Sequence, residues 1–236
     1  MSRIRIDLSG RVAFITGGGS GIGRGLALQM ARDGAAVAVT DLDAAAAAAV
    51  AATQAEFGPV DFLFANAGVL GPADYLAITP YDWDLSLDVN VKGVALTCRA
   101  VVPGMMARRQ GRILITASYN GVRAGAHVIP YRVSKAAILM YTRCLALVLA
   151  PYGVTVNAIC PGVTLTPMQL DYAARTAAER GVSLDDYLAE RSAHIPMHEF
   201  TTIDDLTGLA QFLVSDSARL ITGQAIAPDG GVMMSS

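Results

Sequence analysis

The sequence has few of the residues that build metal centres or disulfide frameworks. Cysteine occurs only at Cys98, Cys144 and Cys160, and histidine only at His127, His194 and His198. The scattered cysteines fit no metal-binding motif, and their odd number argues against a disulfide framework. The histidines show no ligand pattern either. We therefore expect buried, reduced thiols and no metal site.

Charge and long apolar runs are scarce as well. Only 16% of the residues are charged and the net charge is −2, so the basic excess of a nucleic-acid-binding protein is missing. Although 53% of the residues are hydrophobic, no run of about 18 consecutive apolar residues predicts a membrane span. Residues 1–10 lack the apolar core of a signal peptide. These absences predict a cytoplasmic protein without nucleic-acid or membrane partners.

The sequence instead alternates short apolar runs with longer segments of helical periodicity. Strands are expected at residues 12–16, 36–40, 60–65, 112–117, 154–159 and 225–227. The main helical segments are 21–33, 80–108, 130–150 and 203–215. Continuous apolar strands between helices are typical of a parallel sheet buried on both faces. Because no segment has the composition of a linker, residues 1–236 are expected to form one α/β domain.

A glycine-rich turn follows the first expected strand and opens the first helix. It reads TGGGSGIG from Thr16 to Gly23. Glycines permit the tight turn and let the backbone approach a pyrophosphate, while the helix N-terminus offers unpaired N–H groups. The residues expected to contact a dinucleotide here are Gly17, Ser20, Gly21, Ile22 and Gly23.

Asp41 ends the second expected strand, where a carboxylate accepts hydrogen bonds from the ribose of an adenosine. The same charge repels a 2′-phosphate, and no arginine stands at Gly18, Gly19, Ser20 or Leu42 to bind one. The sequence therefore favours NAD over NADP.

A second group of polar residues follows the later strands. Tyr131 and Lys135 are four residues apart at the start of a helix, so they share one face. An ammonium beside a phenol lowers its pKa by typically about 1–3 units, so Tyr131 is expected to exchange a proton with an alcohol while hydride moves to or from nicotinamide. We expect Ser118 to hold the substrate oxygen. Lys135 is expected to bind the nicotinamide ribose, and Asn90 to anchor a water that links Lys135 to solvent.

In this order, the motifs resemble those of the short-chain dehydrogenase/reductase family over nearly the whole chain. They are the glycine-rich turn, Asn66-Ala67-Gly68, Asn90, Ser118, Tyr131-x-x-x-Lys135 and Pro161-Gly162. The resemblance implies a Rossmann-type fold, a doubly wound parallel sheet in three α/β/α layers, and an Asn–Ser–Tyr–Lys catalytic set. It adds to the cofactor site Asn66, Ala67, Gly68, Tyr131, Lys135, Pro161, Gly162, Val163 and Thr166. It also implies a homotetramer or dimer formed through the helices at 80–108 and 130–150.

The chain departs from the family pattern after Asp41. Only nineteen residues separate Asp41 from Asp61, where the family has a further strand and most of a helix, with an acid that contacts the adenine amino group. Either residues are missing from the sequence, or the chain lacks this element and its 36–40 strand forms the sheet edge. Taking the sequence as complete, we expect the second case, with a more open adenine pocket and weakened NAD affinity.

Residues 164–196, between the last two strands, resemble a helical lid over the substrate. Candidate substrate contacts in the lid and before Tyr131 are Tyr119, Asn120, His127, Met168 and Tyr172. The apolar content of the lid favours a small to medium, largely apolar secondary alcohol or ketone.

The leading hypothesis is an NAD-dependent short-chain alcohol dehydrogenase or ketone reductase. Reduction of a 3-oxoacyl thioester stays open, and it calls for a basic entrance to which Arg123 and Arg175 are the candidate contributors. A non-catalytic NAD-binding or scaffold protein also stays open because the cofactor half is shortened. The complete set of four polar groups argues against that last alternative, since a scaffold has no need of them.

Overall fold

The strands form one parallel sheet, as the apolar runs predict. The computed structural model describes residues 6–41 and 46–234. Within these residues the sheet has six strands in the order β2-β1-β3-β4-β5-β6, and every neighbouring pair is parallel. The strands are β1 (Val12–Thr16), β2 (Ala36–Thr40), β3 (Phe62–Ala65), β4 (Gly111–Thr116), β5 (Val154–Ile159) and β6 (Ala225–Ile226).

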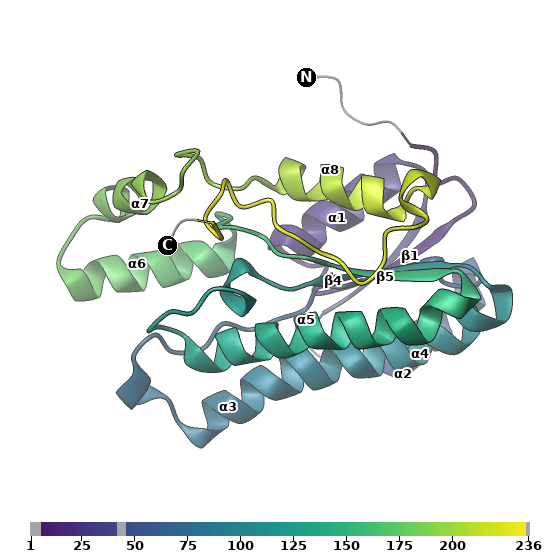
Figure 1. Cartoon of the computed structure of the whole chain (residues 1–236), viewed down its shortest axis with the longest axis horizontal. Coiled ribbons are helices and arrows are strands. Elements are labelled where there is room, and N and C mark those ends of the chain that lie inside the picture. Colours follow the sequence, from purple (N-terminus) through teal and green to yellow (C-terminus); the bar gives the residue numbers. More distant parts are fainter. Residues whose placement is uncertain (1–5, 42–45, 235–236) are drawn as a thin grey trace.

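Helices cover both faces of this sheet and bury its apolar side chains (Figure 1). On one face lie α1 (Gly21–Arg32) and α8 (Ile203–Val214). On the other lie α2 (Ala46–Phe57), α4 (Val94–Arg108) and α5 (Ile129–Leu149), with α3 (Pro80–Leu87) continuing outward. The three-layer, doubly wound α/β architecture is thereby confirmed. All six strands end at the same edge, which is where such sheets bind ligands.

The sheet ends at β2, as expected from the short segment after Asp41. Within the described residues β2 pairs only with β1, and it is only partly buried, with Val39 53% exposed. The stretch that resembles parts of two family helices, 43–49 and 53–58, forms the single helix α2, although residues 42–45 lie outside the described part. Among the residues described between β2 and β3, the chain forms one helix and no outer strand.

The expected 80–108 helix contains a wider turn. Between α3 and α4 the backbone forms a π-helical turn over Asp88–Gly93, and Asn90 lies in it fully buried. Such turns are often found at functional sites. Helical periodicity cannot reveal this turn, because the residue spacing hardly changes.

One helix in the described part is long and apolar enough to cross a membrane, by length and composition only. It spans residues 129–152 and contains α5. Its buried residues include Ile138, Leu139, Ala146 and Leu149, and they belong to the core beside the sheet. Since core helices pass the same test, this is weak evidence for a span.

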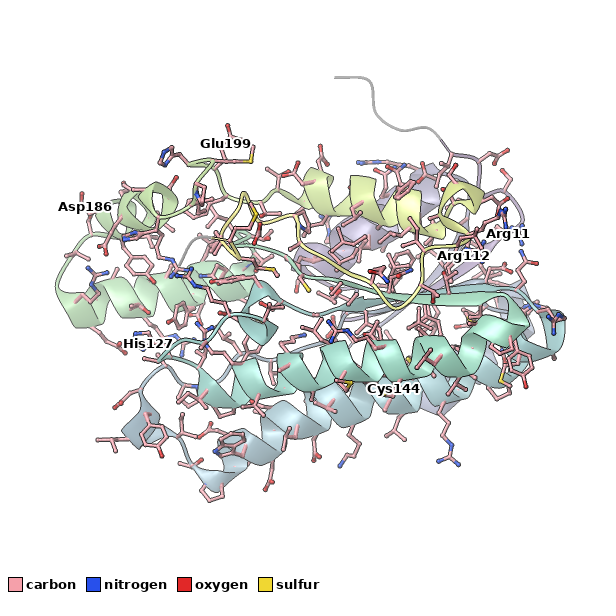
Figure 2. The ribbon with its side chains drawn as sticks, viewed as in Figure 1. Arg11, Arg112, His127, Cys144, Asp186 and Glu199 are labelled. Carbon is pink, nitrogen blue, oxygen red and sulfur yellow. The ribbon has the colours of Figure 1, made fainter. Side chains whose placement is uncertain are left out.

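The expectation of three buried thiols is wrong for one of them. Cys98 and Cys160 are buried, but Cys144 is exposed on α5 (Figure 2). Among the described residues, no group of three or more His, Cys, Asp or Glu side chains gathers to hold a metal ion.

Candidate active site

The glycine-rich turn between β1 and α1 is shaped for an approaching anion. Gly17 and Gly21 have φ values of 65° and 50°, which side chains disfavour. A Cβ at Gly23 would meet the carbonyl oxygen of Gly17, so the turn closes only with glycine there. Ser20, the residue before the helix, makes no side-chain capping bond in the described structure. The first-turn N–H groups of α1 are therefore left for a ligand to bind.

Asn66, at the end of β3, ties this turn to the neighbouring strands. Its Nδ2 donates to the carbonyl oxygens of Thr16 and Gly17, each at 3.2 Å, and its Oδ1 accepts from the Thr116 hydroxyl at 3.0 Å. The Thr16 hydroxyl in turn accepts from the backbone N–H groups of Asn66 and Ala67. Asn66 thus fixes the ends of β1, β3 and β4 relative to one another.

Asp41 lies against the glycine-rich turn, as the sequence predicts for a ribose-binding acid. Its carboxylate accepts a 3.0 Å hydrogen bond from the backbone N–H of Gly19. A Cβ at Gly19 would lie only 2.8 Å from the same oxygen, so glycine leaves room for the carboxylate. A fixed negative charge therefore stands at the mouth of the turn.

Tyr131 and Lys135 occupy the first turns of α5, beside the end of β4. The Lys135 Nζ lies 5.6 Å from the centre of the Tyr131 ring and donates a 2.7 Å hydrogen bond to the carbonyl oxygen of Thr116. Lys135 is buried, and a Cβ on Gly68 would lie 3.4 Å from its amine. Ser118 follows β4 and is also buried. The structure thus brings Ser118, Tyr131 and Lys135 together next to Gly68.

Asn90 supports this group through Ser134 rather than through Lys135. Its Nδ2 donates to the Ser134 hydroxyl at 2.9 Å and to the Val69 carbonyl oxygen at 3.0 Å, and its Oδ1 accepts from the Val69 N–H at 2.8 Å. The Ser134 hydroxyl donates to the carbonyl oxygen of Tyr131 at 2.7 Å. The π-helical turn is therefore joined to the start of α5. Ser134 carried no motif, so the sequence alone did not point to it.

Burial controls the acidity of the two central groups. It raises the pKa of Tyr131 to about 12, against the effect of the nearby Ser118 hydroxyl, and it lowers the pKa of Lys135 to about 8. In the protein alone, the expectation that Lys135 lowers the pKa of Tyr131 is therefore wrong. The amine sits over the ring, and both groups are driven toward their neutral forms.

The residue that starts α5 is held in a strained conformation. Val128 has φ 50° and ψ 46°, a left-handed geometry that is unusual for a β-branched side chain. It is buried, and its N–H donates to the carbonyl oxygen of Ala73. Strain of this kind persists where the surroundings impose it, often near functional sites. Here the strained residue stands directly before α5, three residues from Tyr131.

The segment after β5 closes the site from the other side. Gly162 packs closely on Asp229, since a Cβ there would lie 2.7 Å from the Asp229 Cα. Val163 is buried, and Thr166 caps the next helix by accepting from the N–H of Gln169. The Thr166 side chain would lie 3.2 Å from a Cβ on Gly21. Pro161, Gly162, Val163 and Thr166 thus lead from the sheet edge to the glycine-rich turn.

The expected lid is a pair of helices, α6 (Pro167–Arg180) and α7 (Leu184–Ala193), which projects beyond the sheet (Figure 1). Between the lid and the loop before α5 lies a cavity of about 820 Å³. His127 stands on that loop, between α6 and the first turn of α5 (Figure 2). Of the candidate substrate residues, Tyr119, His127 and Tyr172 line the cavity, whereas Asn120 and Met168 do not.

The cavity wall is more polar than the sequence suggested. Its charged side chains are Asp74, Arg123, Arg132, Glu179, Arg180, Glu190 and Arg191. Arg175, considered as a basic entrance, instead pairs with Asp171 at 2.7 Å and does not line the cavity. The sequence missed Arg132 and Arg191, because only the folding of the lid brings Arg191 to the loop before α5.

Two family models match the chain. One, described as enoyl-(acyl carrier protein) reductase, matches residues 42–233, and one described as short chain dehydrogenase matches residues 11–54. Among curated proteins, a D-beta-hydroxybutyrate dehydrogenase from Cupriavidus necator is 34% identical, with 95% of this chain and 98% of that protein covered.

Solved structures share the same architecture. An actinorhodin polyketide ketoreductase with NADPH is 28% identical with a TM-score of 0.91, covering 98% of this chain and 99% of that one. An NAD⁺-bound xylitol dehydrogenase is 28% identical with a TM-score of 0.89, covering 95% and 99%. The likeness extends over the whole length of both chains in each case.

Proposed function

The chain belongs to the short-chain dehydrogenase/reductase family, and from this we propose that it transfers a hydride between NAD(H) and a small to medium secondary alcohol or ketone. The observation that carries the proposal is the convergence of Ser118, Tyr131 and Lys135 beside the glycine-rich turn. Oxidoreductases of alcohols and ketones recur among the relatives, including the hydroxybutyrate and xylitol dehydrogenases.

The turn fits a dinucleotide on its own evidence. The uncapped start of α1, the close approach between Gly23 and Gly17, and the path of Thr166 past Gly21 leave a cradle for a pyrophosphate. Gly17, Ser20, Gly21, Ile22 and Gly23 would hold it, with Asn66, Ala67 and Gly68 beneath. Val163 and Thr166 would contact the nicotinamide end. When bound, the cofactor supplies or accepts the hydride.

The chain's own residues then handle the proton and the substrate oxygen. Tyr131 is protonated at neutral pH, as an ordinary phenol is, and burial raises its pKa further, so it is in the form that donates a proton to the oxygen of a ketone being reduced. In the opposite direction the phenol first loses its own proton to water, and the phenolate then takes the alcohol proton. Ser118 holds the same oxygen by a hydrogen bond and so fixes it beside the phenol.

Lys135 and Asn90 have supporting roles in this proposal. Lys135 is anchored on the Thr116 carbonyl, which keeps its amine beside the Tyr131 ring and toward the nicotinamide ribose. Asn90 holds Tyr131 in place through Ser134, and the water-anchoring role expected from the sequence is proposed for it as well. The catalytic set proposed is Asn90, Ser118, Tyr131 and Lys135.

NAD is proposed as the cofactor because of Asp41. Its carboxylate, fixed at the N–H of Gly19, accepts hydrogen bonds from a ribose diol and repels a 2′-phosphate. Relatives of this fold are known with NAD⁺ and with NADPH, so the family does not choose between them.

A cytoplasmic homotetramer is the proposed form of the protein. Exposed apolar side chains on α4 and α5, among them Leu96, Met140, Leu147 and Val148, support association through these helices. Each subunit would be a single domain with no nucleic-acid, membrane or metal partner.

A second candidate function is reduction of a 3-oxoacyl thioester. It is favoured by the likeness to the actinorhodin polyketide ketoreductase and by the arginines on the cavity wall. The alcohol dehydrogenase proposal and this one share the catalytic residues and differ only in the substrate.

The test is a substrate screen with purified protein that follows the absorbance of the reduced cofactor, with ketones tested against NADH and NADPH and alcohols against NAD⁺ and NADP⁺. Reduction of simple ketones with NADH, or oxidation of simple alcohols with NAD⁺, supports the proposal, and turnover restricted to thioesters supports the second candidate. Cofactor binding without turnover of any substrate would instead favour a scaffold protein and contradict both.

A further inference from the structure

The cavity beside the active site gathers three arginines from separate segments. Arg123 lies on the loop before α5, Arg132 follows Tyr131 in α5, and Arg191 ends the lid helix α7. Burial is the largest cause of a lowered pKa at Arg132, and the guanidinium groups of Arg123 and Arg191 add to it. Arg123 and Arg191 are therefore each close enough to Arg132 to repel it, which is costly unless something offsets the repulsion.

No carboxylate of the described residues forms an ion pair with any of the three arginines. Of the acids on the cavity wall, Glu190 binds Arg180 at 2.7 Å and Asp74 accepts the N–H of Leu76. The remaining acid, Glu179, is exposed on α6. Arg123, Arg132 and Arg191 thus line the cavity without a carboxylate at ion-pair distance among the described residues.

Arg191 is the most telling member of this cluster. It is only half exposed, and the one hydrogen bond shown for its guanidinium runs to the Tyr119 hydroxyl at 3.5 Å, the limit for such a bond. Arg132 differs, because its Nε and Nη1 hold the carbonyl oxygens of His127 and Arg123 at 2.9 and 2.7 Å. Partly buried cations of this kind are normally paired. Arg191 therefore has donors available for a ligand.

The cluster is continuous with the proposed reaction centre. Tyr119, which meets Arg191, is the residue after Ser118, and its N–H donates to the carbonyl oxygen of Pro161. Val163, beside the nicotinamide path, lines the same cavity as Tyr119 and Arg191. A molecule whose oxygen sits at Ser118 and Tyr131 thus extends past Tyr119 toward the arginines.

We propose that the substrate carries its own carboxylate, which Arg191 binds together with Arg132 and the Tyr119 hydroxyl. The substrate class is then a short-chain hydroxy acid or oxo acid, rather than a largely apolar alcohol or ketone. Arg suits this role because its fork of N–H donors matches a carboxylate. This inference rests on the proposed function, since the carboxylate is placed relative to the oxygen held at Ser118 and Tyr131.

The kinetic test compares oxo acids with their methyl esters, which have the same carbonyl without the charge. The wild-type protein is expected to favour the acid in kcat/KM by about 10- to 100-fold, the range for a lost charged hydrogen bond. Arg191→Gln should remove this preference mainly by raising KM for the acid, and Arg191→Lys should restore part of it. Arg175→Gln, a lid arginine paired with Asp171 outside the cavity, is the matched control and should keep the preference.

A binding test separates this inference from the proposed function. Pentanoate, but not pentanamide, is expected to raise the unfolding temperature of the wild type and of Arg175→Gln, and not of Arg191→Gln. If no substrate turns over, the proposed function fails, and the binding of pentanoate alone then decides whether the arginines bind a carboxylate. The carboxylate-binding proposal is overturned by equal kcat/KM for acid and ester, or by equal effects of pentanoate and pentanamide on the unfolding temperature. It is also overturned by a preference for a 3-oxoacyl coenzyme A thioester over the free acid, because the arginines would then serve the carrier's phosphate.

Discussion

The side-chain amine of Lys135 lies 5.6 Å from the centre of the Tyr131 ring, and its hydrogen bond goes to the Thr116 carbonyl oxygen. The backbone of β4 thus holds the amine in place, while the ring carries the phenol toward Ser118. Because burial favours the neutral form of both groups, the resting site presents a protonated phenol next to an amine that loses its charge easily. Substituting Tyr131 tests proton transfer, whereas substituting Lys135 tests how stability depends on pH.

Tyr131→Phe is expected to leave the fold intact and reduce turnover by about 100- to 10,000-fold, the range for a general acid or base. The ring still fills its place, and only the proton is lost. Absorbance of NADH at saturating substrate measures the loss, and thermal unfolding checks the fold. Activity within a few-fold of the wild type would refute the acid/base role.

Lys135→Met should change how stability depends on pH. From about pH 8 to about pH 10, the unfolded lysine keeps its proton and the folded one has lost it, so unfolding takes up a proton. Lys135 therefore makes the wild type more stable as the pH rises through this window. Tyr131 acts in the opposite direction only above about pH 10, where the unfolded phenol ionises first.

The measurement is urea unfolding of both proteins at about pH 8 and about pH 9.5, inside the window set by these pKa values. The free energy of unfolding of the wild type should rise relative to Lys135→Met between the two. Taking the difference between the proteins cancels the titration of the other groups. A difference that stays flat across this window contradicts the lowered pKa.

Ser134→Ala should weaken the link between Asn90 and Tyr131. Its hydroxyl accepts from Asn90 and donates to the Tyr131 carbonyl oxygen, and it is fully buried. Losing both bonds is expected to cost about 1–3 kcal/mol of stability. It should also lower kcat more than it changes KM, since the start of α5 is less well fixed. Ser134→Thr, which keeps the hydroxyl, is the control, and a stability equal to that of the wild type in Ser134→Ala would contradict the link.

Asp41→Ala should relax the preference for NAD over NADP. The carboxylate, held by the Gly19 N–H, places a negative charge at the mouth of the turn. The ratio of kcat/KM with the two cofactors measures the change, with Asp74→Ala, whose acid caps a distant turn, as the control. An unchanged ratio in Asp41→Ala rejects Asp41 as the group that reads the ribose.

The sheet edge at β2, with no outer strand among the described residues, predicts weaker NAD binding than in family members that have such a strand. The adenine amino group lacks the acid that the family places on that strand, and a lost hydrogen bond lowers affinity about 5- to 10-fold. Calorimetry on mass-verified protein, beside the Cupriavidus necator dehydrogenase in the same buffer, measures this. Equal affinity would show that other residues close the adenine side.

The sequence by itself determined the strands, their parallel arrangement and the glycine-rich turn between β1 and α1. Apolar runs such as 154–159 and the glycines from Gly17 to Gly23 are local signals, since each follows from the geometry of a short stretch of chain. The spacing between Asp41 and Asp61 was enough to predict that β2 forms the sheet edge, because nineteen residues hold one helix but not a helix, a strand and another helix.

Only the tertiary structure decided the electrostatics and the shape of the substrate side. Whether the pKa of Tyr131 is raised or lowered depends on how deeply distant segments of the chain bury the phenol, and the spacing of residues in the sequence does not predict that burial. Arg132 and Arg191 are separated by almost sixty residues of unrelated sequence, and they meet because the lid folds back over the loop before α5. Contacts of this kind arise from packing between elements, so the sequence that forms each element does not reveal them.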